Sequence, residues 1–441
     1  MLTCSSSSEK VRNDAPRARP NILLIVVDTL RADHLSAYGY ARPTSPAIDA
    51  LAARGVRFDR HRAQAPCTFP SMNSLLTSRP VETFFGQSQG DMSIPAGVTS
   101  VAELLRGEGY ITAAFSASPI VRKNPSQFNQ AGGFQRGFQL FDDECLWKDA
   151  RCVNDRALAA LARHRTGEPV FFLLHYIDPH GPYQAPVLGR RKRFARHGAR
   201  RELPPEVRAG ESHAAAARLD RGEPAGVDAA GIAHWVDLYD DEIAFVDARI
   251  GELVEAFERG APARGTVVAL AADHGESFLE HGTLAHCRSL YDTEIRTPWI
   301  VAGPGIPQGA VRDALSENLD IVPTLLDLAG VAVAESAFAG RSLAALIGSG
   351  EAAPARLQTS AFAGWRAAFD GRHKLMVNET AGELRLFDLV QDPGERADLA
   401  PAERRTAAAL RRALAEQSPT PESALEAARE TERQLRALGY L

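Results

Sequence analysis

The stretch Pro20–Asp28 reads PNILLIVVD and decides the fold class. Its apolar part, Asn21–Val27, shows no alternation of apolar and polar residues. A short continuous apolar run bounded by a proline and an aspartate is typical of a strand buried on both faces of a parallel sheet. Similar runs occur at Pro169–Leu174, Thr266–Ala272 and Trp299–Ala302, so we predict four buried strands.

Helical patterns separate these strands. A helix is expected from Ser45-Pro46 to Gly55, another along the apolar stripe from Trp235 to Gly260, and a third over Ile321–Leu328. Strands that alternate with helices predict an α/β fold, with a mostly parallel sheet flanked by helices on both faces.

The chain is predicted to divide into a leader, residues 1–19, and two domains. The larger domain covers residues 20–350 and the smaller C-terminal domain residues 351–441. Within the first, residues 187–230 are rich in arginine and alanine and lack an apolar period, which indicates a surface insertion that partly closes over the site. Beyond residue 350, Trp365–Phe369 and His373–Val377 flank an Asp-Gly turn, a hairpin signal that predicts an antiparallel α+β domain.

Composition restricts the partners. A net charge of −5 over 441 residues supplies no basic field for nucleic acid, so no nucleic-acid partner is expected. No apolar run is long enough to be a transmembrane segment. Cys4 before Ser5–Ser8 resembles a bacterial lipoprotein junction, so two interpretations stay open: a lipid anchor at Cys4, with a periplasmic location if a signal precedes it, or a disordered leader on a cytoplasmic protein.

The five cysteines form an odd and sparse set, for which we expect no disulfide framework. Cys145 and Cys152 are close enough in sequence to form a bridge.

Polar residues follow two of the predicted strands. Asp28 ends the first, and Asp273-His274-Gly275-Glu276 follows Thr266–Ala272. Taken alone, Asp28 could be a helix N-cap. Ligands collect at the carboxyl ends of parallel strands, and carboxylates beside an imidazole suit a divalent ion. We therefore predict a metal site at Asp28, Asp273 and His274.

A further helix is predicted in the segment Thr68–Thr77 (TFPSMNSLLT). Pro70 suits a first helical turn, which puts the Thr68 hydroxyl at the helix mouth, where anions are favoured. The alternative is a plain N-cap threonine.

Several motifs in this order resemble the bacterial sulfatase family, within the alkaline phosphatase superfamily, over residues 20–441. They are Pro20–Leu35 (PNILLIVVDTLRADHL), Asp178–Tyr183 (DPHGPY), Ala272–Ser277 (ADHGES), Asp320–Leu326 (DIVPTLL), Phe387–Leu389 (FDL) and Asp392–Glu395 (DPGE). The resemblance implies an alkaline-phosphatase-like α/β core in which a metal-activated nucleophile attacks sulfur or phosphorus.

Matched position by position, the resemblance assigns the metal to Asp28, Asp273 and His274 and the nucleophile to Thr68. It also implies that His180 contacts the substrate or leaving group and that His286 lies at the bound ester. Both histidines could instead be structural, held by hydrogen bonds.

The sequence departs from the family pattern at the nucleophile. Thr68 occupies the place of the cysteine or serine that sulfatases convert to formylglycine, and Met72 that of the motif's arginine. Thr29 replaces a second acidic ligand, and Cys67 is one residue out of register. We therefore expect Cys67 to be an ordinary cysteine and Thr68 to be unmodified.

These residues predict a metal-dependent hydrolase that cleaves small anionic phosphate, phosphonate or sulfate esters through Thr68. One divalent ion is expected, Ca²⁺, Mn²⁺, Mg²⁺ or Zn²⁺. Phosphorus esters are expected to react faster, because a threonyl ester must wait for water. Two alternatives are a formylglycine-independent sulfuric ester hydrolase and a non-catalytic protein that only binds anions.

Overall fold

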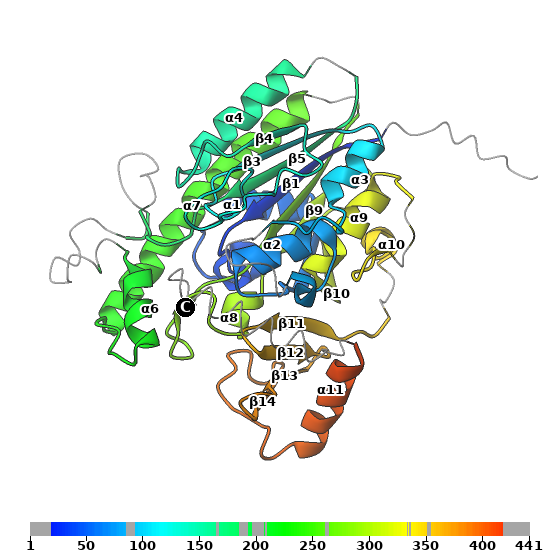
Figure 1. The fold of residues 1–441 in the computed structure, drawn as a ribbon. Helices are drawn as coiled ribbons and strands as arrows, with labels where there is room; N and C mark the ends of the chain where they lie inside the picture. Colours follow the sequence, from blue (N-terminus) through cyan, green and yellow to red (C-terminus); the bar gives the residue numbers. More distant parts are fainter. Residues whose placement is uncertain are drawn as a thin grey trace, which may run out of the picture.

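The computed structural model describes residues 19–84, 93–164, 167–184, 193–195, 207, 210–260, 264–332, 334, 337–350 and 354–417 (Figure 1). The predicted leader, except its last residue, and Cys4 lie outside these residues. So do much of the predicted 187–230 insertion and the last part of the C-terminal domain.

A central sheet of eight strands has the order β10-β2-β9-β6-β1-β5-β3-β4. The strands are β1 (Asn21–Val27), β2 (Gly55–Arg62), β3 (Ile111–Ser116), β4 (Leu140–Asp142), β5 (Val170–Tyr176), β6 (Thr266–Ala272), β9 (Trp299–Ala302) and β10 (Ala310–Glu317). All neighbours pair in parallel except β9, which is antiparallel to both β2 and β6. The predicted mostly parallel sheet is thus confirmed, and the four predicted strands are β1, β5, β6 and β9.

Helices cover both faces of this sheet (Figure 1). One face packs against α1 (Pro46–Ala53), α4 (Ala150–Arg163) and α7 (Ala229–Gly260). The other packs against α2 (Thr68–Thr77), α3 (Val101–Gly107), α9 (Ile321–Leu328) and α10 (Ala344–Ser349). Helix α7 begins six positions before the predicted start at Trp235, because the apolar stripe marks only its buried part.

Strand β1 shows why an apolar run without alternation indicates a central strand. Leu23, Ile25 and Val27 belong to the core on one face of the sheet. Ile22, Leu24 and Val26 belong to the core on the other face, and all six are fully buried. Burying such a side chain stabilises a protein by roughly 1.5–3 kcal/mol, so both faces hold β1 rigidly.

The C-terminal part forms a second, antiparallel sheet with the order β11-β12-β13-β14. Its strands are β11 (Gln358–Phe362), β12 (Trp365–Phe369), β13 (His373–Asn378) and β14 (Glu383–Asp388), and β12 and β13 form the predicted hairpin. Helix α11 (Arg404–Gln417) packs on this sheet through Leu410 and Leu414 (Figure 1). The boundary after residue 350 stays a prediction.

Further short elements lie in the connections between these strands and helices. They are the helices α6 (Ser212–Asp220) and α8 (Asp292–Ile295), the strands β7 (Ser277–Phe278) and β8 (Leu284–Ala285), and the 3-10 turns η1 (Ala32–His34), η2 (Ser36–Tyr38), η3 (Val81–Phe84) and η4 (Asn318–Asp320). Helix α6, from the predicted insertion, packs against β8. Among the residues that the structure describes, no helix is both long and apolar enough to cross a membrane.

Candidate active site

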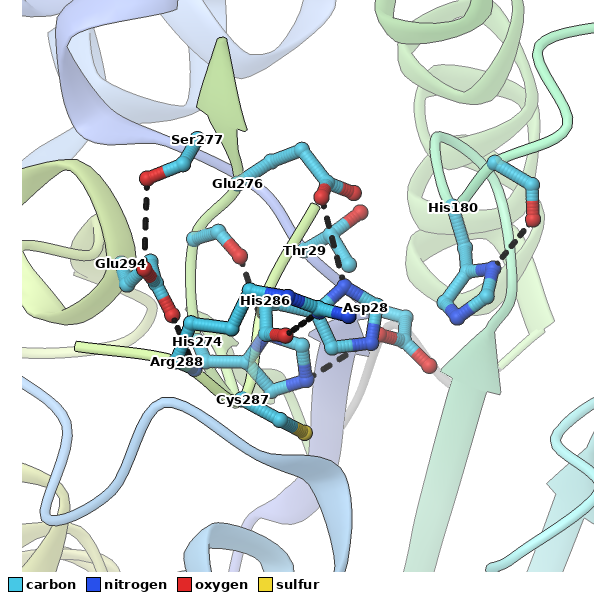
Figure 2. A network of polar contacts seen from close by, with 12 residues as sticks. Asp28, Thr29, His180, His274, Glu276, Ser277, His286, Cys287, Arg288 and Glu294 are labelled. Carbon is cyan, nitrogen blue, oxygen red and sulfur yellow. Dashed lines mark hydrogen bonds and ion pairs between the residues drawn. The ribbon is translucent and has the colours of Figure 1, made fainter. Parts of the chain in front are cut away.

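Asp28, Asp273 and His274 meet at the ends of two neighbouring strands. Val27 of β1 pairs with Ala272 of β6, so the next residues, Asp28 and Asp273, leave the sheet side by side. His274 Nε2 lies 3.5 Å from Asp28 Oδ1 and 3.6 Å from Asp273 Oδ2. The three ligand atoms all lie within 4.8 Å of one another, as expected for groups that share one ion. Two of the three residues, Asp28 and His274, can be seen in Figure 2.

The donor atoms of this trio fit a divalent cation. Asp28 Oδ1 and Asp273 Oδ2 are buried and have no hydrogen-bond partner. Burial, and then repulsion from Asp273 and Glu276, raises the pKa of Asp28 well above its ordinary value. Buried carboxylates are normally paired or bound to a metal, and a cation here would satisfy both oxygens and remove the repulsion. The role of the trio as ligands stays a prediction.

Thr68 is the first residue of α2, after the N-cap residue Cys67. Its Oγ1 lies 3.1 Å from His274 Nε2, so the hydroxyl reaches the trio. The same helix is fixed to β6, because Ser71 Oγ donates a hydrogen bond to the carbonyl oxygen of Asp273. The predicted nucleophile and the predicted ligands are therefore brought together at the positive end of a helix.

Thr29 occupies a strained conformation beside the trio. Its φ of 56° is unusual for a β-branched residue and costs about 1–3 kcal/mol. Its backbone N–H lies 3.3 Å from Asp273 Oδ1, and its carbonyl oxygen accepts a hydrogen bond from the Tyr239 hydroxyl. The strained backbone amide thus orients the Asp273 carboxylate, and the Thr29 side chain supplies no second acidic ligand.

Gly275 is explained by a close approach of two backbones. A Cβ atom at this position would lie 2.2 Å from the carbonyl oxygen of Thr293. The backbone N–H of Gly275 donates to Glu294 and that of Glu276 to Thr293. Only glycine lets the chain after His274 pack this tightly against α8.

His180 and His286 lie close to each other across the mouth of the site (Figure 2). Their ring centroids are 4.8 Å apart, and His286 is 4.6 Å from His274. His180 Nδ1 donates to the carbonyl oxygen of Gly181 at 2.6 Å. Burial lowers the pKa of His180 to about 4, and burial together with the neighbouring histidines lowers that of His286 well below its ordinary value.

Two histidines near the site were missed from the sequence. His213 of α6 stacks on His180 with the ring centroids 4.9 Å apart. His175 of β5 is fully buried, and its Nε2 lies 3.7 Å from Asp273 Oδ2. His175 could have been noticed, because a polar histidine inside an apolar strand is unusual and indicates a buried polar contact. The alanine-rich sequence around His213 contains no comparable feature.

The expectation that the cysteines form no disulfide framework is wrong, whereas the bridge that the sequence left open between Cys145 and Cys152 is present. Cys67 is bonded to Cys287, with 4.8 Å between their Cα atoms, and Cys145 is bonded to Cys152. The first pair is 220 residues apart in sequence, and such a pairing depends on the fold. This disulfide links the residue before Thr68 to the residue after His286, so the Cys67 sulfur is not a free thiol. The expectation that Cys67 is not converted to formylglycine stays a prediction.

A cavity of about 540 Å³ opens beside His180. Trp147, Lys148, Asp149 and Glu242 contribute to its walls. The rings of Trp147 and His180 lie 5.6 Å apart, so the cavity adjoins the histidine cluster and has room for the organic part of an ester.

Two family profiles match the chain. The profile described as Sulfatase matches residues 20–331, which is more than half of the chain. The chain belongs to the sulfatase family. A second profile, described as N-sulphoglucosamine sulphohydrolase, C-terminal, matches residues 280–419. The predicted family is thus confirmed, and the protein is an ester hydrolase of the alkaline phosphatase superfamily.

Similar proteins span most of the chain. A choline-sulfatase of Rhizobium meliloti is 27% identical and covers 87% of this chain and 82% of its own length. A Delta 4,5-hexuronate-2-O-sulfatase of Bacteroides thetaiotaomicron is 25% identical and covers 87% and 85%. The solved phosphonate monoester hydrolase of Agrobacterium radiobacter superposes with a TM-score of 0.70 at 20% identity, covering 96% of both chains, which confirms the fold.

Proposed function

We propose that this sulfatase-family hydrolase cleaves small phosphorus esters, phosphate or phosphonate, with Thr68 as its nucleophile. We further propose that one divalent ion, Ca²⁺, Mn²⁺, Mg²⁺ or Zn²⁺, is held by Asp28, Asp273 and His274. The observation that carries the proposal is the 3.1 Å contact between Thr68 Oγ1 and His274 Nε2. It lies inside a trio in which Asp28 Oδ1 and Asp273 Oδ2 are buried without a hydrogen-bond partner.

The reaction begins with attack of Thr68 Oγ1 on phosphorus. A divalent ion at the trio would supply positive charge that lowers the pKa of the Thr68 hydroxyl and polarises an ester oxygen. The hydroxyl proton leaves to solvent, an Oγ1–P bond forms, and the bond from phosphorus to the leaving oxygen breaks in line. The N-terminus of α2 stabilises the negative charge beside Thr68.

His180 and His286 act on the side of the ester away from Thr68. A bound anion favours the protonated imidazole, which offsets the burial that otherwise keeps His180 neutral. His180 then protonates the leaving oxygen, and His286 contacts an ester oxygen. In the second half of the reaction, water attacks the threonyl ester and returns a proton to His180. Thr68 regains its proton from solvent.

The preference for phosphorus follows from the nucleophile. A formylglycine hydrate carries a spare hydroxyl that expels sulfate, whereas a threonyl ester has no internal way to break down. The threonyl phosphate formed from a phosphomonoester carries two negative charges for the cation to hold while water attacks, whereas a threonyl sulfate carries one. Sulfate ester hydrolysis without formylglycine is the second candidate, favoured by the sulfatase names of the relatives.

The test compares kcat/KM on an aryl phosphomonoester, an aryl phosphodiester, an aryl phosphonate monoester and an aryl sulfate with the same leaving group, each with the four candidate ions. Thr68→Ala should lower the rate by roughly 10³-fold or more, whereas Thr77→Ala, at the other end of α2, should retain it. A sulfate preference above about tenfold, or 1.4 kcal/mol of transition-state free energy, would refute the phosphorus assignment. No turnover of any ester would leave only the anion-binding alternative.

A further inference from the structure

Three histidines form a cluster beside the proposed ligand trio. His180, His213 and His286 each offer a ring nitrogen, and these atoms all lie within 4.8 Å of one another. They come from three separate segments, the loop after β5, helix α6 and the segment after β8. No local sequence pattern requires this convergence.

The hydrogen bonds of the cluster leave one nitrogen of each ring available to a ligand. His180 Nδ1 donates to the carbonyl oxygen of Gly181, which leaves the Nε2 lone pair available. His286 Nδ1 lies 3.3 Å from Oε1 of the fully buried Glu276, which likewise leaves Nε2. His213 Nε2 is buried without a hydrogen-bond partner. A carboxylate or carbonyl behind an imidazole is the usual support of a metal-ligating histidine, since it fixes the tautomer and the ring orientation.

We propose that His180, His213 and His286 form a second cation site, which binds a transition-metal ion such as Zn²⁺ and inhibits the hydrolase when occupied. Three imidazoles with an open fourth position are a donor set that zinc accepts. Nitrogen ligands select Zn²⁺, Cu²⁺ or Ni²⁺ over Mg²⁺ and Ca²⁺, which prefer oxygen. The two carboxylates of the first trio make it the harder of the two sites.

Inhibition follows from the position of the cluster and rests on the proposed function. His180 Nε2 is the atom that would give its proton to the leaving oxygen, and an ion bound to that nitrogen excludes the proton. His286 would also lose its contact with the ester. A bound Zn²⁺ therefore removes both groups that act on the far side of the ester from Thr68.

Metal stoichiometry tests the site without any assay of hydrolysis. The metal-free protein is dialysed against Zn²⁺, and the bound zinc per chain is measured by elemental analysis. We expect two ions in the unchanged protein, one in Asp28→Ala, one in His213→Ala and none in the double variant. His373→Ala, in β13 of the C-terminal sheet, is the matched histidine control and should still bind two. One ion in the unchanged protein, or two in His213→Ala, would overturn the proposal.

The regulatory part is tested on the Mg²⁺- or Mn²⁺-loaded enzyme. Added Zn²⁺ should lower the rate of the unchanged protein at least tenfold, and the ratio of rates with and without Zn²⁺ should return to near one in His213→Ala. Activation by Zn²⁺, or equal inhibition in both proteins, would overturn the inhibitory role. If no ester is hydrolysed, the proposed function fails while the stoichiometry still decides the existence of the site.

Discussion

Replacing Cys67 and Cys287 together by alanine removes a cross-link between residues 220 positions apart. Closing a loop of this length in the unfolded chain is expected to stabilise the protein by about 5 kcal/mol. The bridge between Cys145 and Cys152, only 7 positions apart, should contribute about 2.5 kcal/mol by the same relation. The two double variants should therefore differ by about 3 kcal/mol in their free energy of unfolding.

Urea unfolding followed by circular dichroism measures this difference, provided that the slope m is fitted separately for each variant, because removing a cross-link exposes more surface. The Cys145→Ala/Cys152→Ala variant is the matched control. The Cys67→Ala/Cys287→Ala variant should also show the larger loss of kcat, since its bridge adjoins Thr68 and His286. Equal losses of stability in the two variants would refute the loop-length reasoning, and unchanged kcat in the first would refute the positioning role.

Two further predictions concern buried groups near the sheet edge. Burial lowers the pKa of His61 to about 3, so the unfolded chain binds a proton at this residue more readily than the folded chain does. The free energy of unfolding should therefore be highest above pH 6.5 and fall toward pH 3 by up to about 1.4 kcal/mol per pH unit. In a pH series of urea titrations His61→Gln should show a shallower fall, and an identical fall would contradict the assignment. The added methyl group of Gly275→Ala must displace the chain at Thr293, which should cost about 1–3 kcal/mol of stability and weaken metal binding measured by calorimetric titration. Gly348→Ala, which has open space around it, is the control and should change neither stability nor metal affinity. A normal metal affinity in Gly275→Ala would contradict this reasoning.

The central sheet could be predicted where strands are buried on both faces. The run Asn21–Val27 matches β1 residue for residue, because every side chain there is buried. Strands β2 and β10 at the far edge were not predicted, since their faces carry the polar runs Gly55–Arg62 and Ala310–Glu317 with mixed burial. The antiparallel direction of β9 could not be predicted either, because an apolar run carries no information on strand direction.

Site residues that directly follow predicted strands could be predicted, whereas some site residues contributed by other segments of the chain could not. Asp28 and Asp273 were found because residues after parallel strands share one sheet edge. His213 comes from the predicted insertion, whose sequence has no period that could place it. The Cys67–Cys287 bridge joins segments 220 positions apart, so only the folded chain brings them together.

The same bridge bears on the chemistry that replaces formylglycine. Conversion to formylglycine needs a free cysteine thiol or serine hydroxyl at the helix mouth, and here that position is Thr68. The neighbouring Cys67 sulfur is bonded to Cys287 in the folded protein, so it is not available for oxidation to an aldehyde. Both routes to an aldehyde nucleophile are thus closed by particular residues, and the group left beside His274 is the threonine hydroxyl. With Thr68 as the proposed nucleophile, water would have to complete each turnover, because its hydroxyl has no second oxygen to expel the product. This requirement is the physical reason to test phosphorus esters first.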